Sequence, residues 1–319
     1  MHRLSKQNLL AAASAIILLI AGGCDESFDP RGPYVKRLVV YGVVSSRSDS
    51  QYVRIYTTYN PAGFDPLENT SDTYVRNATV SMTDDSATYI FNETVILRDE
   101  KSRYSSDVVA YFAYPCPTRP GKAYSLAIAS DQGNATAKVS VPGKGYVFNN
   151  TPYIFVRPKT STEDIPVSIG LSPVTQAYLI RLYINFDVGD GPNLTHMRLE
   201  VPSAIDSAGG SFQYAYRYAY PTLTRRPASS AVNLVFPRGA YLALYRNLEN
   251  LYGVFQLTSA TFVLTQVESN LYNYYNLANG FRDPYSIRED QPDFSNIVGG
   301  FGVFGAMVED SVVVDLRNK

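Results

Sequence analysis

Short apolar and β-branched runs alternate with turn residues along most of the chain. Residues 38–44 form such a run, which predicts a strand buried on both faces. Residues 123–129 and 135–141 alternate apolar and polar side chains around a turn at residues 131–134, which predicts a β-hairpin. Similar runs predict strands at residues 52–57, 78–82, 87–91, 93–97, 177–186, 197–201, 211–220, 231–236, 239–245, 260–267 and 310–316.

One segment near the C-terminus follows the helical period instead. Its apolar residues have the spacing i, i+3, i+4 and i+7, which predicts a helix over residues 268–279. The glycine directly after this segment suits a helix end. The apolar positions are Leu271, Tyr274, Tyr275 and Ala278.

Strands at regular short spacing, with turn residues between them, are typical of β-sandwiches. We therefore predict an all-β (mainly β) fold: tandem β-sandwich (immunoglobulin-like) modules with one short C-terminal helix. Pro142 and Gly143 open a segment that predicts a crossover between two units. The expected domains are an N-terminal β-sandwich at residues 35–145 and a C-terminal β-rich domain at residues 146–319.

The N-terminus has the pattern of a lipoprotein signal peptide. Arg3 and Lys6 precede an apolar run at residues 9–20, and three small residues lead directly to Cys24. The apolar run is shorter than the roughly 20 residues that a membrane-spanning helix needs. We expect cleavage after residue 23 and lipidation of Cys24, so that lipid anchors the mature chain to a membrane. The alternatives are an ordinary signal peptide with a chance cysteine and a short anchor helix.

Acidic residues follow the predicted lipidation site. Asp25, Glu26 and Asp29 lie in the segment 24–34, which we interpret as an acidic lipid tether. Acidic residues at this place resemble the signal for surface display in Bacteroidota-type lipoproteins. We therefore expect a lipid-anchored protein of the outer membrane, displayed on the cell surface. A solvated tether without a targeting role has the same charges.

Composition argues against nucleic-acid binding and against an internal disulfide. Removal of residues 1–23 takes away two of the 28 basic residues and leaves 26 against 29 acidic residues. A chain with this balance and no basic stripe is not expected to bind nucleic acid. The 26 tyrosines suit half-buried sheet surfaces. Cys116 is the one cysteine besides Cys24, so we expect a buried or loop thiol and no internal disulfide.

The sequence offers no catalytic constellation. His196 is the one histidine of the mature chain, and no nucleophile motif accompanies it. We therefore predict a surface strand residue at His196, a protein that is not an enzyme, and no cofactor. The glycines at residues 299–305 lack the lysine of a phosphate loop, so we expect them to serve tight turns or close approach to the tyrosine-rich helix.

Two motifs are candidate binding sites. A period of two places four tyrosines on one face of the predicted strand 211–220, as an aromatic platform for a ligand or partner; the alternative is a packed cross-strand ladder. A turn with oxygen ligands is a weak calcium candidate, and a plain hairpin turn is favoured over it. The residues are Tyr214, Tyr216, Tyr218 and Tyr220 for the platform, and Asp187, Asp190 and Asn193 for the turn.

Three motifs occur in the order known from one family. Residues 38–44 (LVVYGVV) follow the predicted lipidation site, residues 121–126 (GKAYSL) lead to Val141 and Pro142, and residues 295–306 (SNIVGGFGVFGA) follow the tyrosine-rich helix. Together they resemble the Bacteroidota outer-membrane lipoprotein family called domain of unknown function 4249. The resemblance implies β-sandwich modules and frequent association with TonB-dependent transporters, and it supplies no catalytic residues.

The expected function is therefore that of a non-enzymatic binding or accessory subunit. We expect a cell-surface lipoprotein that works with a TonB-dependent outer-membrane transporter. The alternative is a structural surface protein, such as a fimbrial or surface-layer subunit built from β-sandwiches. A hydrolase is disfavoured because the mature chain has a single histidine and no motif.

Overall fold

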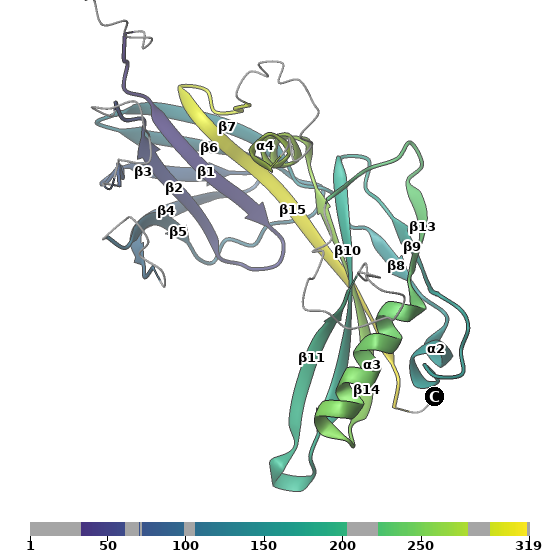
Figure 1. Ribbon diagram of the computed structural model, residues 1–319. Coiled ribbons are helices and arrows are strands. Elements are labelled where there is room, and N and C mark those ends of the chain that lie inside the picture. The colour runs from purple at the N-terminus through teal and green to yellow at the C-terminus, as the bar shows by residue number, and fades with distance from the viewer. Residues whose placement is uncertain are drawn as a thin grey trace, which may run out of the picture. The chain divides into compact units, whose positions relative to one another are not determined.

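A computed structural model describes residues 33–60, 70, 72–98, 106–202, 223–279 and 294–317. Residues 36–319 form one compact unit; residues 1–35 form a separate unit, whose described part, residues 33–35, holds no helix or strand. Figure 1 labels the elements along the chain. The strands are β1 (Leu38–Ser45), β2 (Gln51–Thr57), β3 (Thr79–Thr83), β4 (Thr88–Ile96), β5 (Val108–Ala113), β6 (Ala123–Ser130), β7 (Gly133–Ser140), β8 (Tyr146–Phe148), β9 (Ile165–Gly170), β10 (Ala177–Val188), β11 (Thr195–Val201), β12 (Thr224–Arg225), β13 (Ala231–Phe236), β14 (Gln256–Val267) and β15 (Gly300–Asp315); the helices are α2 (Pro152–Val156), the 3₁₀ turn η2 (Gly191–Asn193), α3 (Arg238–Tyr252) and α4 (Ser269–Asn279).

The strands of the compact unit form a large hydrogen-bonded sheet and a small one. The large sheet has the order β11-β10-β14-β15-β1-β2-β5-β4-β3-β6-β7, and β12 pairs with β10 beside this path. The small sheet has the order β13-β9-β8. The fold is therefore all-β and sandwich-like, as the strand pattern predicted.

Strand β15 belongs to both halves of the large sheet (Figure 1). Its first half runs parallel to β1, in a register from Leu38↔Gly300 to Ser45↔Met307. Its second half runs antiparallel to β14, in a register that ends at Ser259↔Asp315. The last strand of the sequence thus completes the N-terminal strands as well as the C-terminal ones.

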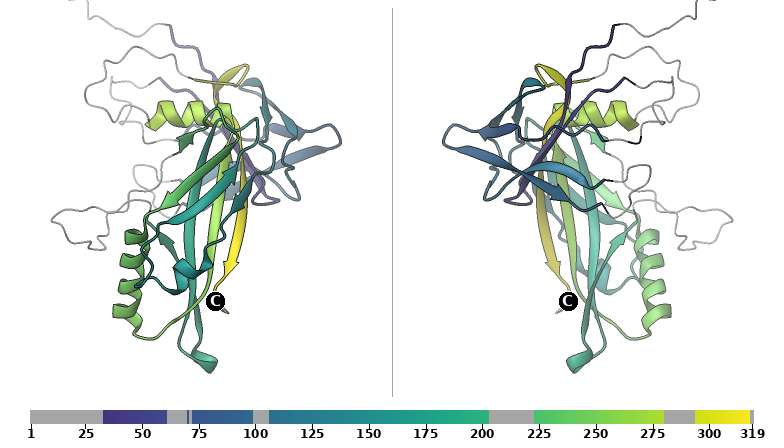
Figure 2. Two further views of the ribbon diagram at one scale, coloured as in Figure 1. Left: turned by 90° about the vertical axis from the view of Figure 1, so that its right-hand side faces the viewer. Right: turned by 90° about the vertical axis from the view of Figure 1, so that its left-hand side faces the viewer.

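Two hydrophobic clusters form the core. The first lies among the strands of the N-terminal half and takes Phe304, Ala306 and Val308 from β15. The second lies between the inner face of β10 and β14, the small sheet and α3, with Phe262 and Tyr241 fully buried. Figure 2 shows the small sheet and α3 on one side of the β10–β14 strands. On the opposite face of these strands, the described side chains of β10 are mostly half-buried.

The strand predicted at residues 239–245 is wrong, because this segment belongs to the 15-residue helix α3. The buried side chains recur at helical spacing and face the second cluster. Gly253 ends the helix with φ +67°. The buried positions of α3 are Ala240, Tyr241, Ala243, Leu244 and Leu248.

The first predicted strand is also corrected in one respect. Strand β1 is buried on one face only, because Tyr41 and Val43 are each 37% exposed while Val40 is fully buried. The predicted helix over residues 268–279 is confirmed as α4. Residues 87–91 and 93–97 form one strand, β4, in place of two. The predicted strand 211–220 lies outside the described residues.

Gly299 lies in the turn directly before β15, residues 300–305 belong to β15, and the glycines of this segment serve close approach, as predicted. A Cβ at Gly302, whose φ is +105°, would lie 2.1 Å from the Val40 carbonyl oxygen. A Cβ at Gly305 would lie 2.6 Å from Leu271 Cβ in α4. These glycines therefore let β1 and α4 approach β15 from two sides.

Candidate functional site

The predicted lipid anchor and the predicted tyrosine platform cannot be placed in the structure. Cys24 and the four tyrosines Tyr214, Tyr216, Tyr218 and Tyr220 lie outside the described residues. The described residues instead form two hollows on the outer face of the large sheet. By the strand alternation, residues 303 and 309 of β15 face the same side, so this strand lines both hollows.

The first hollow, called here the tyrosine groove, lies between α4 and the outer face of β1 and β2. Its volume is about 530 Å³, within the usual range for ligand sites. Tyr52 and Tyr275 are 45% and 43% exposed. The lining residues are Tyr41, Gly42, Val43, Ser45, Ser50, Gln51, Tyr52, Arg54, Leu271, Tyr274, Tyr275 and Val303.

A row of aromatic contacts includes Tyr41 and Tyr274 of the tyrosine groove and continues beyond its lining residues. Tyr41 packs edge-on against Tyr274 of α4 at 5.9 Å and against Tyr56 of β2 at 6.1 Å, between ring centroids. Tyr56 in turn lies 5.1 Å from Tyr74. Burial, together with a hydrogen bond to Tyr274, raises the pKa of Tyr41 to about 12. The Tyr41 hydroxyl is therefore neutral at physiological pH, and its ring is held in place by the neighbouring rings.

A buried carboxylate fixes α4 above this groove. Glu268 is 3% exposed, and its two oxygens accept hydrogen bonds from Asn270 N (2.7 Å), Leu271 N (2.8 Å) and Ala306 N (3.2 Å). Burial raises the pKa of Glu268, and these backbone N–H groups oppose that shift. Glu268 thus caps the helix and joins its first turn to β15.

We expect Glu268→Ala to lower the free energy of unfolding by about 2 kcal/mol, because a helix cap is lost and a buried N–H of β15 is left without an acceptor. Urea unfolding followed by circular dichroism measures the change. Glu249→Ala is the matched control, since Glu249 forms a surface ion pair with Lys159 and should cost about 0.5 kcal/mol. Equal midpoints for the Glu268 variant and the wild type would contradict the capping role.

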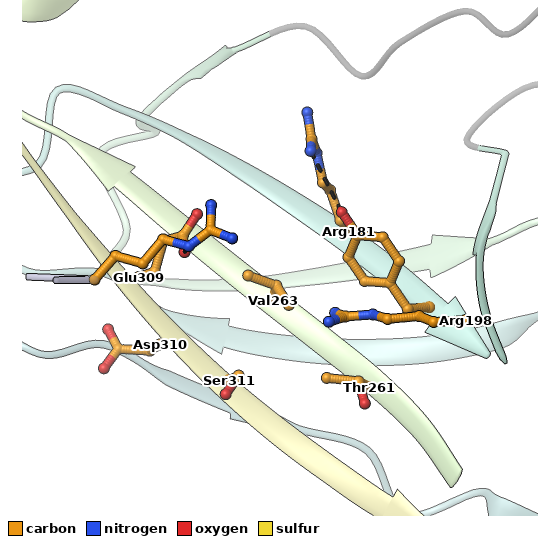
Figure 3. A pocket seen from close by; sticks show the side chains of 9 residues that line it. Arg181, Arg198, Thr261, Val263, Glu309, Asp310 and Ser311 are labelled. Atoms are coloured by element: carbon orange, nitrogen blue, oxygen red, sulfur yellow. Dashed lines mark hydrogen bonds and ion pairs between the residues drawn. The ribbon is translucent and has the colours of Figure 1, made fainter. Parts of the chain in front are cut away.

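The second hollow, called here the arginine groove, lies on the outer face of β10, β11, β14 and β15. Figure 3 shows Arg181 and Arg198 opposite Glu309, with Val263 on the strand between them. The pairing Arg181↔Val263↔Ser311 places these three side chains in one row across the sheet. The volume is about 470 Å³, and the lining residues are Arg47, Arg181, Tyr183, Arg198, Thr261, Val263, Glu309, Asp310 and Ser311.

Tyr183 organises the cationic side of the arginine groove. The Arg198 guanidinium carbon lies 3.9 Å from the centroid of its ring, a cation–π contact. Arg181 Nη1 donates to the Tyr183 hydroxyl at 3.3 Å. That hydrogen bond raises the pKa of Arg181, and burial raises the pKa of the neighbouring Glu200 carboxyl. The Tyr183 ring therefore orients both guanidinium groups.

The turn proposed as a calcium candidate lies at the far end of this sheet face. The Asp187 carboxylate contacts His196 Nδ1 at 2.6 Å, and Asp190 precedes η2, where Asn193 N donates to its carbonyl oxygen at 3.0 Å. Among the described residues, no group of three or more histidine, cysteine or acidic side chains could hold a metal ion. The geometry is that of a hairpin turn, and calcium binding by this turn stays a prediction.

Two other sequence predictions can be placed. His196 lies exposed on β11, as expected of a surface strand residue. Cys116 is a buried free thiol, and burial raises the pKa of this thiol to about 12. A thiol with so high a pKa is a poor nucleophile at neutral pH.

The fold and these surfaces define an all-β protein with two cores joined by a shared strand and two open grooves on one sheet face. The family described as domain of unknown function (DUF4249) matches residues 25–312, and the chain belongs to this family. No protein with curated annotation matches the chain. None of the helices in the described ranges has the length and apolar character needed to cross a membrane.

Both grooves use residues that the sequence interpretation passed over. The outward positions of β1 and β2 carry Tyr41 and Tyr52, and the outward positions of β10 carry Arg181 and Tyr183. The signal is the alternation of large polar or aromatic side chains with buried aliphatic ones. The sequence prediction placed the aromatic surface at residues 214–220 instead, because four tyrosines alternate there without a gap.

Proposed function

We propose that this chain is a non-enzymatic binding protein that serves as an accessory subunit of a TonB-dependent outer-membrane transporter. Lipid on Cys24 anchors it to the outer membrane, and the acidic segment after Cys24 directs it to the cell surface. The non-enzymatic role rests on the sequence, which has one histidine in the mature chain and no nucleophile motif.

The tyrosine groove is the observation that carries this proposal. Exposed aromatic rings with hydroxyl groups are enriched where proteins contact partners, because they bury a large apolar area and lose little conformational entropy. Tyr52 packs on Phe112 at 4.9 Å between centroids, so its ring is supported from the side and is exposed toward solvent. A tyrosine platform was expected from the sequence at residues 214–220, and the groove offers the same chemistry at other residues.

Affinity purification tests the proposal. The tagged full-length protein is extracted from its native outer membrane in mild detergent, and bound proteins are identified by mass spectrometry. We expect a TonB-dependent barrel in about equimolar amount with the wild type. The double variant Tyr52→Ala/Tyr275→Ala should recover at least tenfold less of it, because two interface anchors are removed.

Tyr153→Ala is the matched control, since Tyr153 is 47% exposed on α2, outside both grooves, and this variant should retain the barrel. Retention of the barrel by the double variant would exclude the tyrosine groove as the contact. Recovery of the wild-type protein alone, or as polymers of itself, would refute the accessory role and favour a structural surface protein.

A further inference from the structure

Nitrogen donors outnumber their acceptors in the arginine groove. Three guanidinium groups carry about fifteen N–H donors in all. Within the described part of the chain, the one hydrogen bond that they donate inside the groove is the 3.3 Å bond from Arg181 to Tyr183. Arg181 Nε is buried and has no hydrogen-bond partner among the described residues. Three other described arginines also have a buried Nε without a partner, but none of them lines this groove.

The neighbouring carboxylates compensate these charges only loosely. Arg47 Nε lies 3.6 Å from Glu309, and Arg181 Nε lies 3.7 Å from Glu200, both longer than a hydrogen bond. For Arg198, the described residues contain no carboxylate within ion-pair distance. Three cations therefore converge on a hollow in which no carboxylate of the described residues lies within hydrogen-bond distance of them.

The other acidic residue that lines the groove, Asp310, accepts hydrogen bonds from groups outside the groove. Asp310 accepts hydrogen bonds from Gly145 N at 2.8 Å and from Gln266 Nε2 at 3.2 Å. Its neighbours Glu309 and Ser311 face the opposite side of β15 by the strand alternation. Asp310 is thus held by neutral backbone and amide donors and forms no ion pair with the three arginines.

The walls of the groove fix the direction of the donors. The Tyr183 ring orients Arg198 through the cation–π contact and Arg181 through its hydroxyl. Thr261 and Ser311 add hydroxyl groups, and Val263 adds an apolar surface. A rigid guanidinium fork matches the two oxygens of a carboxylate, which a mobile lysine does not.

We propose that the arginine groove is a binding site for a ligand that carries a carboxylate, separate from the tyrosine groove. Arg198 and Arg181 bind the carboxylate oxygens, and Arg47, which is 74% exposed in its side chain, closes the groove from the β1–β2 turn. The hydroxyl groups and Val263 contact the body of the ligand. Acidic sugars and peptide C-termini both supply this chemistry.

Isothermal titration calorimetry on the full mature protein in mild detergent tests the proposal with two matched pairs of probes. Trigalacturonic acid is compared with neutral galactotriose, and trialanine is compared with its C-terminal amide. We expect at least one acid to bind at least tenfold more tightly than its neutral partner, and added salt to weaken that binding. Binding of the sugar acid alone assigns an acidic glycan, and binding of the peptide alone assigns a peptide C-terminus; binding of both acids supports general carboxylate recognition.

For the acid that binds, Arg198→Gln should lower the affinity at least tenfold, and Arg47→Gln should also lower the affinity. Arg246→Gln is the matched control, because Arg246 is exposed on α3 and outside the groove. Thermal unfolding of each variant shows whether it is folded; Arg47, on an exposed turn, provides a second test if the Arg198 variant is unstable. Equal affinity for acid and neutral probes, no binding of either acid, or unchanged affinity in both folded variants would overturn the proposal.

Discussion

A fragment of residues 33–145 will not fold, although it holds the seven strands of the N-terminal half. In the whole chain, β1 pairs with β15, and the first hydrophobic cluster includes Ile297, Phe304 and Val308. The fragment loses these side chains and leaves one edge of β1 without hydrogen-bond partners. Loss of buried side chains of this size costs on the order of 8 kcal/mol together, which is comparable with the whole stability of a typical domain.

Urea unfolding and the dispersion of amide signals in NMR spectra measure this outcome. We expect no cooperative transition and collapsed amide signals for the fragment. The matched control is the same fragment with residues 294–309 fused through a flexible linker, which restores the strand next to β1 and should restore a cooperative transition. Cooperative unfolding of the unfused fragment would show that β15 is dispensable for the first core and that residues 35–145 are an independent domain.

The second large effect is expected at Gln266, a fully buried side chain in β14. Its oxygen accepts hydrogen bonds from Ser172 N and the Thr175 hydroxyl, both at 2.8 Å. Its nitrogen donates to the Gly143 carbonyl oxygen and to Asp310, both at 3.2 Å. All four hydrogen-bonding positions of the amide are therefore used, and they join the crossover segment after β7 to the second core.

We expect Gln266→Leu to lower the free energy of unfolding by about 4 kcal/mol. Leucine fills a similar volume, but several buried polar partners lose their hydrogen bonds, at about 1–3 kcal/mol for each group left unsatisfied. Urea unfolding measures the change. Gln256→Leu is the control on the same strand, because Gln256 is exposed and its replacement should change stability by about 0.5 kcal/mol or less. A cost below 1 kcal/mol at Gln266 would contradict this account.

The two grooves share one structural border. The turn between β1 and β2 contributes Arg47 to the arginine groove and Ser50 to the tyrosine groove. Ser46 in the same turn accepts a hydrogen bond from Glu309 N at 3.4 Å. A partner in the tyrosine groove would therefore contact the turn that carries one of the three arginines proposed to bind a ligand.

The sequence by itself determined the fold class, most strands, helix α4 and the family. These features depend on local periodicity and on motif order, which are present in the chain before it folds. The glycines of residues 299–305 were also assigned correctly, since close backbone approach is a property of the residue type. The anchor at Cys24 and the surface location are predictions of the same local kind.

Only the tertiary structure decided how the two halves are joined and where the open surfaces lie. The pairing of β1 with β15 connects residues about 260 positions apart, and no local pattern encodes such a partner. Helix α3 was predicted as a strand because its short apolar run, Tyr241 to Leu244, fits either period until the second core selects one face. The tyrosine and arginine grooves likewise depend on cross-strand register, which places side chains from distant strands on one face of the sheet.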